Sequence, residues 1–273
     1  TIGQSNTGIG VNALCKNTTG SENTSVGFQS LLSNTTGTQN TAVGACTLYY
    51  NTIGQNNTAI GRNTLYYNTT GLNNTAVGIQ ASYNNTTGIY NTSLGANAMC
   101  ANISGNTNTA LGAYSLRNNT TAGANTASGY YALNKNTTGT RNTASGSLSM
   151  YLNTTGSFNT ASGFYTLRNN TTGGLNTAIG YHAGNAVTSG LKNTFVGAET
   201  DSTGNYNNST ALGYGAQINE SNTVVLGTSS EKIVGTGDVS LNKALFVNGD
   251  ASFNGNVTIV GDFKADKITN EDI

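Results

Sequence analysis

The stretch NTAVGACTLYYNTIGQN, residues 40–56, is seventeen residues long, and a closely similar phrase begins again at Asn57. Asn-Thr pairs recur every seventeen residues at twelve positions: Asn6, Asn23, Asn40, Asn57, Asn74, Asn91, Asn108, Asn125, Asn142, Asn159, Asn176 and Asn193. The consensus is N-T-A-h-G-x-x-[AST]-L-x-x-N-T-T-G-x-x, where h is aliphatic, and we number its columns from this first Asn. Helix-pair repeats need about 33 residues or more, so a period this short and regular predicts a parallel β-solenoid with one repeat per turn.

The composition agrees with this all-β fold. Only 8% of the residues are charged, Pro and Trp are absent, and 36 residues are Gly. Disordered chains are usually rich in charge and Pro, and this chain lacks both. We therefore expect a solenoid in which ladders of backbone and side-chain hydrogen bonds replace a bulky core.

Two columns carry most of the large aliphatic side chains. Column four includes Ile9, Val26, Val43, Ile60, Val77, Leu94 and Leu111, and column nine includes Leu14, Leu31, Leu48, Leu65, Met99, Leu116 and Leu133. We predict that both rows point inward, one from each of two short strands per turn. About one Val and one Leu per turn is a thin core, so such turns are expected to stack and to oligomerise.

The remaining regular columns predict the corners of each turn. Column five (Gly44 in the opening stretch) and column fifteen (Gly54) are expected to supply backbone with positive φ. The Asn residues of columns one and twelve (Asn40 and Asn51) are expected to bond to their equivalents in the neighbouring turns.

The phrase N-T-A-[IV]-G resembles the head repeats of YadA-type trimeric autotransporter adhesins and stretches of phage or large-virus tail fibres. The resemblance implies a left-handed β-roll in which three chains pack side by side as a homotrimer, with about fourteen residues per repeat. This chain has three more residues per turn. Its period shortens to sixteen between Gly197 and Gly213 and to fourteen between Leu212 and Leu226.

We divide the chain into seventeen-residue repeats (1–200), shortened repeats and a transition (201–236), and a β-shaft or neck segment (237–273). The last segment alternates apolar residues, such as Leu245 and Val247, with Asn-Gly and Gly-Asp turns. It resembles the intertwined β-prism shafts of phage tail fibres. Because residue 1 lies in the middle of a repeat, the chain is expected to be part of a longer fibre.

Aromatic residues provide the candidate contacts with a receptor or glycan. These are Tyr49, Tyr50, Tyr66, Tyr67 and Tyr83 in columns ten and eleven, with Tyr90 and Phe158 in column seventeen. Stacked rings offer flat apolar area for a sugar. The alternative, and the more common arrangement, is structural stacking between adjacent turns.

The remaining departures from the consensus are three serines, three cysteines and one histidine. Ser128, Ser145 and Ser162 replace the aliphatic residue of column four, either as a polar or ion site or because nearby aromatics supply the bulk. The three cysteines, Cys15, Cys46 and Cys100, are expected to be reduced, buried fillers. The single His182 has no ligand partner at suitable spacing, so no metal site is predicted.

No catalytic set is recognisable, and neither an enzyme activity nor a cofactor is expected. The formal net charge is zero and no run of about 18 apolar residues occurs, so we predict neither nucleic-acid binding nor membrane insertion. The leading hypothesis is a structural fibre on a virion or other extracellular surface that supports host attachment. Its expected partners are itself, a host-surface receptor or glycan, and other fibre or virion proteins.

Two alternatives remain from the sequence. A bacterial trimeric adhesin head at the cell surface has the same repeat style. An ice-binding solenoid is a remote alternative, because the column-two threonines, beginning with Thr7, Thr24 and Thr41, are regularly spaced.

Overall fold

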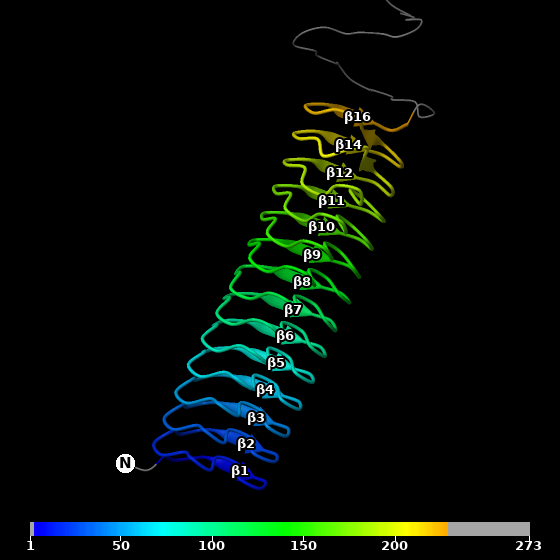
Figure 1. Ribbon diagram of the computed structural model, residues 1–273. Helices are drawn as coiled ribbons and strands as arrows, with labels where there is room; N and C mark the ends of the chain where they lie inside the picture. Colours follow the sequence, from blue (N-terminus) through cyan, green and yellow to red (C-terminus); the bar gives the residue numbers. More distant parts are fainter. Residues whose placement is uncertain (1–2, 229–273) are drawn as a thin grey trace, which may run out of the picture. The chain divides into compact units, whose positions relative to one another are not determined.

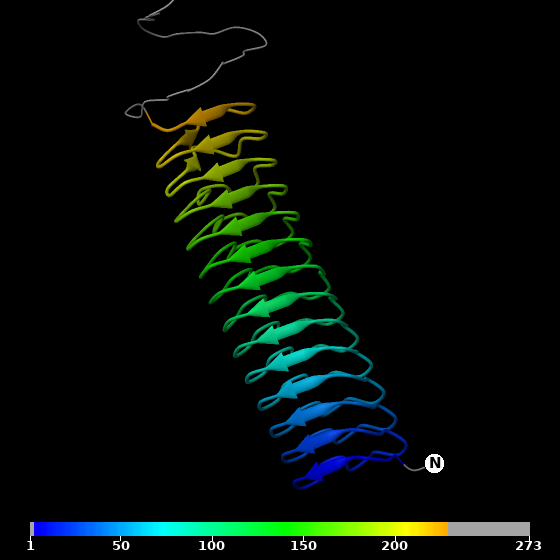
Figure 2. The same cartoon turned by 180° about the vertical axis from the view of Figure 1, so that it is seen from behind.

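The computed structural model describes residues 3–228, which form a column of stacked coils with one short strand per turn along most of its length (Figures 1 and 2). Fourteen of its strands make one parallel sheet in which neighbours in sequence are neighbours in space. The strands of this sheet are β1 (Thr7–Ile9), β2 (Thr24–Val26), β3 (Thr41–Val43), β4 (Thr58–Ile60), β5 (Thr75–Val77), β6 (Thr92–Leu94), β7 (Thr109–Leu111), β8 (Thr126–Ser128), β9 (Thr143–Ser145), β10 (Thr160–Ser162), β11 (Thr177–Ile179), β12 (Thr194–Val196), β14 (Thr210–Leu212) and β16 (Val224–Leu226).

The strand register confirms the predicted β-solenoid. Thr41 pairs with Thr58, its equivalent seventeen residues later, and this offset holds from β1 to β12. The offset then falls to sixteen between Thr194 and Thr210, and to fourteen between Thr210 and Val224. A second sheet of two strands, β13 (Asp201–Ser202) and β15 (Gln217–Ile218), forms in these last turns.

The interior differs from the prediction for column four. In β3 the middle residue, Ala42, is fully buried, whereas Thr41 and Val43 flank it on the outer side. In β4 the column-four residue Ile60 is 41% exposed. Successive side chains of a strand point to opposite faces, and Ala is the residue that faces the narrow interior. The prediction that column four forms an inward row is therefore wrong.

Column nine is buried as predicted, although not in a strand. Leu48 and Leu65 are fully buried and have φ of 50° and 48°, in the left-handed region. A backbone of this kind costs non-glycine residues about 1–3 kcal/mol. It is held by complete burial of the side chain and by hydrogen bonds between turns, such as Leu48 N–H to the Thr64 carbonyl at 3.0 Å. Most turns thus contain one strand, not the predicted two.

The two glycine columns serve different purposes. Gly44 of column five has a φ of 130°, as predicted for a corner. Gly54 of column fifteen has no such φ, and that part of the prediction is wrong. A Cβ on Gly54 would lie 2.3 Å from Asn51 Oδ1 and 2.6 Å from the Gly71 carbonyl oxygen, so this column needs glycine for space.

The asparagine ladders are confirmed. Asn40 Nδ2 donates to Asn23 Oδ1 at 3.1 Å, and Asn51 Nδ2 donates to Asn34 Oδ1 at 2.8 Å. Both amides also donate to the carbonyl oxygen of Gly54, at 2.8 and 3.0 Å. The two ladders and the column-fifteen carbonyls therefore form a polar network inside the coil, where most buried amides are satisfied by their equivalents above and below. Among the described residues Asn170 Oδ1 is an exception, because the next residue of its column is Val187.

The three cysteines are free, but they are not the buried fillers expected. Cys15 is exposed, and Cys46 and Cys100 are half-buried, because columns seven and ten lie at the surface. The shaft segment 237–273 and the end of the transition segment lie outside the described residues. Within residues 3–228, no helix is long and apolar enough to cross a membrane.

Candidate functional site

Five of the predicted aromatic residues form one cluster, which we call the tyrosine ladder (Tyr49, Tyr50, Tyr66, Tyr67 and Tyr83). Tyr49 stacks on Tyr66, and Tyr66 on Tyr83, each with ring centroids 5.1 Å apart. Tyr50 stacks on Tyr67 at 5.3 Å with an interplanar angle of 3°. Since equivalent residues recur directly above one another, rings in the same column are forced into parallel stacks.

The two stacks also contact each other edge to face. Ring centroids are 4.7 Å apart for Tyr49 and Tyr50 and 4.8 Å apart for Tyr66 and Tyr67, with interplanar angles of 70° and 86°. Stacked faces cover one another, so the ladder presents mainly ring edges and hydroxyl groups to solvent. Structural stacking accounts for most of the ring surface, and a free face is left for a ligand only at the ends of each stack.

Packing inside the ladder changes the acidity of its phenols. Burial raises the pKa of Tyr66 to about 12, and the neighbouring Tyr50, Tyr49 and Tyr83 add to the rise. Burial also raises the pKa of Tyr83, with a smaller contribution from its hydrogen bond to Tyr67. Tyr66 and Tyr83 therefore stay uncharged throughout the neutral pH range.

A groove runs along the coil beside the ladder, between the side chains of column eleven and the threonines of column thirteen. We call it the threonine groove. It widens into three hollows of about 550, 590 and 540 Å³. The first begins at Lys16 and contains Tyr50 and Tyr67, the second continues from Tyr67, and the third contains Lys135.

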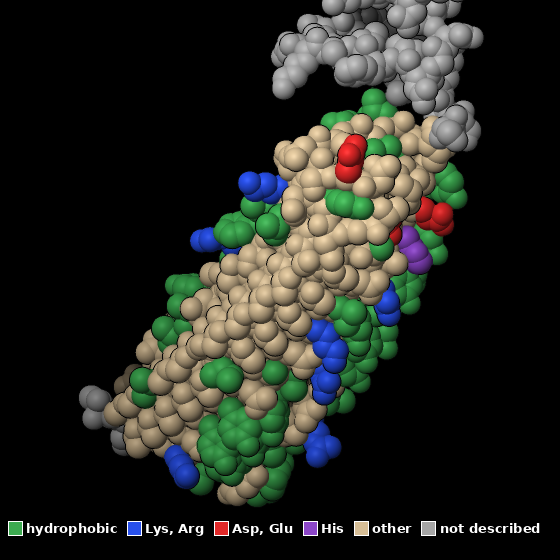
Figure 3. All heavy atoms as spheres, turned by 45° about the horizontal axis from the view of Figure 1, so that its top comes forward, with side chains coloured by type: hydrophobic (Ala, Val, Ile, Leu, Met, Phe, Trp, Pro, Cys, Tyr) green, Lys and Arg blue, Asp and Glu red, His purple; other side chains and the backbone are tan. Residues whose placement is uncertain are grey.

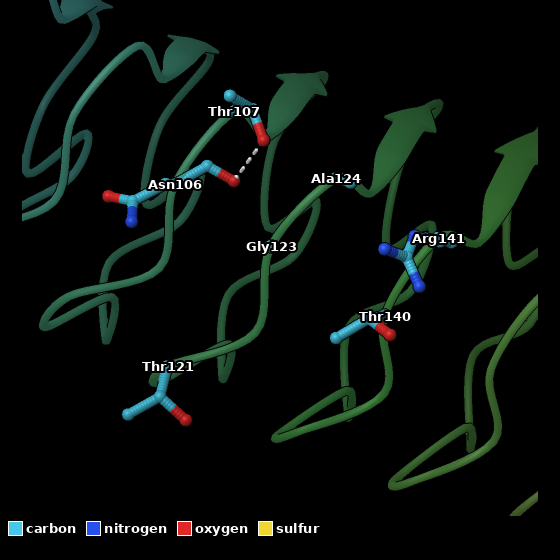
Figure 4. A pocket seen from close by; sticks show the side chains of 7 residues that line it. All are labelled: Asn106, Thr107, Thr121, Gly123, Ala124, Thr140 and Arg141. Atoms are coloured by element: carbon cyan, nitrogen blue, oxygen red, sulfur yellow. Dashed lines mark hydrogen bonds between the residues drawn. The ribbon is translucent and has the colours of Figure 1, made fainter.

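Tyr90 and Phe158, the other two predicted contacts, lie away from the ladder. They belong to column seventeen and are 59% and 48% exposed. The Phe158 ring is covered by Arg141, whose Cζ lies 5.1 Å from the ring centroid. On the turns between them is a shallow hollow of about 380 Å³, lined by polar and small side chains from three adjacent turns (Figure 4).

A second aromatic cluster was not among the predicted contacts. Tyr114 stacks on Tyr131 at 4.8 Å, and further along the column Tyr165 packs against His182 at 5.1 Å. Arg168 lies over Tyr165, with its Cζ 4.9 Å from the ring centroid. The signal was present in the sequence, because column seven becomes aromatic over these turns.

Two buried nitrogens of this second cluster, Arg168 Nε and His182 Nε2, have no hydrogen-bond partner among the described residues. For Arg168, contact with aromatic ring faces takes the place of such a bond.

The outward side of the large sheet is a further surface, which we call the sheet face. It consists of the column-two and column-four side chains of β1 to β12, β14 and β16, none of which is charged. Ile9, Leu94 and Ile179 are 59%, 49% and 46% exposed there. Figure 3, in which the sheet face is turned away, shows further patches of hydrophobic side chains on the opposite side of the column.

The three serines of column four belong to this sheet face. Ser145 and Ser162 are exposed and Ser128 is half-buried, so they do not line the interior of the coil. Tyr130 and Phe164 of column six are 51% and 41% exposed on the same stretch. The apolar surface therefore moves from column four to column six where the serines occur.

Titratable groups are sparse. Within residues 3–228, no three His, Cys, Asp or Glu side chains gather closely enough to hold a metal ion. Burial raises the pKa of Asp201, although hydrogen bonds from the Ala186 and Ser202 N–H groups oppose this rise. The surfaces of the described coil are thus suited to contact and binding through stacking, apolar area and hydroxyl groups.

The comparisons with known proteins do not assign the chain to a family. Neither a scan against protein-family models nor a search of curated proteins finds a match to the chain.

Proposed function

We propose that the protein is a structural fibre, a homotrimer on a virion or other extracellular surface that supports attachment to a host. The observation that carries the proposal is the sheet face. Fourteen strands in register expose a strip of Thr and mostly aliphatic side chains without one charge, in which Ser replaces the aliphatic residue in β8, β9 and β10. Exposed apolar strips of this extent are typical of surfaces that other chains cover.

The dimensions of the sheet face suit an interface between copies of the chain. At about 4.8 Å per strand, fourteen strands span roughly 65 Å, and three residues add a width of about 10 Å. The resulting area of roughly 650 Å² approaches the ~800 Å² that each partner buries in a standard interface. Exposed column-six residues such as Phe28 and Tyr181 border the strip and would add to it.

A trimer of such coils would be a stiff rod that holds several copies of each surface site at fixed spacing. Linked weak sites gain affinity through avidity, which is the physical basis of attachment in this proposal. Left-handed coils and a β-prism shaft over 237–273 belong to the same proposal. A bacterial trimeric adhesin head would use the same architecture, and only its anchoring and origin would differ.

Ice binding is the second candidate, favoured by one observation. The column-two threonines lie side by side on the sheet face, as in the pairs Thr41 with Thr58 and Thr58 with Thr75. Regularly spaced hydroxyl and methyl groups on a flat face can order water. A face covered by other copies is not free to bind ice, so the two functions exclude each other. Measurable thermal hysteresis of the purified protein would favour ice binding.

The fibre proposal is tested by the mass and shape of the full chain in solution. Light scattering and sedimentation should give three times the chain mass, and electron microscopy should show rods. Ile60→Lys/Leu94→Lys places charges on two exposed positions of the sheet face and should dissociate the trimer. Thr36→Lys/Gln55→Lys adds the same charges at exposed positions off this face and should not. A monomeric wild-type protein, or equal behaviour of the two variants, would refute the proposal.

A further inference from the structure

We propose that the threonine groove binds an extended acidic polysaccharide, with Tyr50 stacking on a sugar ring and Lys16 and Lys135 pairing with its carboxylates. This inference deepens the proposed function, on which it rests, by naming the chemical class of the attachment ligand and its site. Four features of the groove carry it.

The first feature is an open aromatic face. Tyr50 stacks on Tyr67 on one side, and its equivalent in the preceding turn is Ser33, which is too small to cover the other side. Tyr50 is 41% exposed, and Lys16, Ser33 and Tyr50 line the same hollow. A pyranose ring has an apolar C–H face of matching size, so this end of the stack is a preformed platform for one sugar.

The second feature is the hydrogen bonding of the threonine hydroxyls in column thirteen. Thr35 Oγ1 donates to the Thr52 carbonyl at 3.0 Å, and Thr52 Oγ1 donates to the Thr69 carbonyl at 3.1 Å. The same bond recurs further along, for example from Thr137 to the Thr154 carbonyl at 3.1 Å. Each hydroxyl hydrogen is thus committed, while the oxygen retains lone pairs that accept. The groove offers acceptors and methyl groups, and a carbohydrate offers hydroxyl donors and C–H surface.

The third feature argues against a peptide ligand that pairs as an added strand. The Thr52 carbonyl already accepts from the N–H groups of Thr35, Thr36 and Gly37, at 3.0, 3.2 and 3.3 Å. An added strand needs unpaired N–H and C=O groups at a sheet edge. This wall of the groove has its backbone groups bonded to the next turn, so main-chain pairing is not available there.

The fourth feature is the combination of length, repeat and charge. Column eleven repeats every turn, at about 4.8 Å, which is close to the length of one sugar unit in an extended chain. Lys16 and Lys135 lie in this column seven turns apart and line the first and third hollows. The four acidic residues of 3–228 are Glu22, in column seventeen, and Glu199, Asp201 and Glu220, in the last turns. None of them lines the three hollows, so lysine provides the only charged side chains that do.

The test uses calorimetric titration of the full chain with three probes. They are a mannuronate oligosaccharide, a neutral cello-oligosaccharide of equal length, and a glutamate oligopeptide of equal charge. The mannuronate probe should bind best, and its affinity should fall with added salt because exposed charge pairs are screened. Binding of the glutamate peptide alone, or of no probe, would overturn the proposal.

Three variants locate the site. Tyr50→Ala should weaken mannuronate binding about tenfold, the loss expected for about 1.4 kcal/mol of stacking. Ser33→Tyr covers the outer face of Tyr50 but offers an equivalent free face one turn earlier, beside Lys16, and should keep mannuronate binding. Lys16→Gln should weaken mannuronate binding about threefold and leave the neutral probe unchanged. Tyr90→Ala, which removes an exposed ring outside the groove, is the matched control and should bind as the wild type.

The outcomes separate this inference from the fibre proposal. Circular dichroism and light scattering on the same samples report folding and oligomeric state. If the rods form but Tyr50→Ala and Lys16→Gln bind mannuronate as the wild type does, the groove proposal fails alone. If a monomeric chain binds mannuronate and loses it in these variants, the fibre proposal fails and the groove assignment stands.

Discussion

Replacing one asparagine of the buried ladder should destabilise the whole column. Asn57→Ala removes four side-chain hydrogen bonds. The lost donor bonds run from Nδ2 to Asn40 Oδ1 at 3.1 Å and to the Gly71 carbonyl at 2.8 Å. The lost acceptor bonds come from the Asn74 backbone N–H at 3.0 Å and from Asn74 Nδ2 at 3.1 Å.

The magnitude follows from which partners remain satisfied after Asn57→Ala. The Gly71 carbonyl still accepts from Asn68 Nδ2, and Asn74 Nδ2 still donates to the Gly88 carbonyl. The Asn74 N–H loses its acceptor, and a buried orphan of this kind costs about 1–3 kcal/mol. The other three bonds contribute roughly 1 kcal/mol each. We therefore expect a loss of about 4–6 kcal/mol in the free energy of unfolding.

Denaturant unfolding followed by circular dichroism measures this loss at a fixed protein concentration, because association also stabilises the folded state. Gln55→Ala, at an exposed position two residues away, is the matched control and should change stability by less than about 0.5 kcal/mol. Each turn contacts mainly its neighbours, so the variant should also broaden or split the transition. A loss below about 1 kcal/mol for Asn57→Ala would refute the view that the ladder stabilises the coil.

Two further predictions concern the glycine column and the tyrosine ladder. Gly54→Ala places a Cβ 2.3 Å from Asn51 Oδ1, and this overlap should lower the free energy of unfolding by about 1–3 kcal/mol or more. The control Thr36→Ala should leave the free energy of unfolding almost unchanged in the same assay. Phenolate absorbance should show a titration step near the pKa of about 12 of Tyr66, and Tyr66→Phe should reduce that step. Because this pKa lies above the ordinary value of 10.0, the contribution of Tyr66 to stability is complete below pH 10 and is lost as the pH rises towards 12. A free energy of unfolding that does not change between pH 10 and 12 would contradict this prediction.

The period of seventeen was sufficient to predict how the turns stack. Residues one period apart coincide in successive turns, so the parallel register, the Asn40 and Asn51 ladders and the stacked tyrosines all follow from the sequence. The burial of Leu48 was also predictable, since its column is almost invariably a large aliphatic residue. These predictions depend only on which residues repeat, and not on the shape of the turn.

The directions of side chains within a turn were decided by the tertiary structure. Val43 is apolar and was assigned to the core, but Ala42 faces the interior, and the pleat turns Val43 outward. The left-handed backbone of Leu48 and the crowding around Gly54 likewise depend on contacts with the next turn. A repeat determines which residues lie above one another. Which of them face the interior, a groove or an exposed sheet depends on the backbone angles at each corner, and those are set by the packing of neighbouring turns.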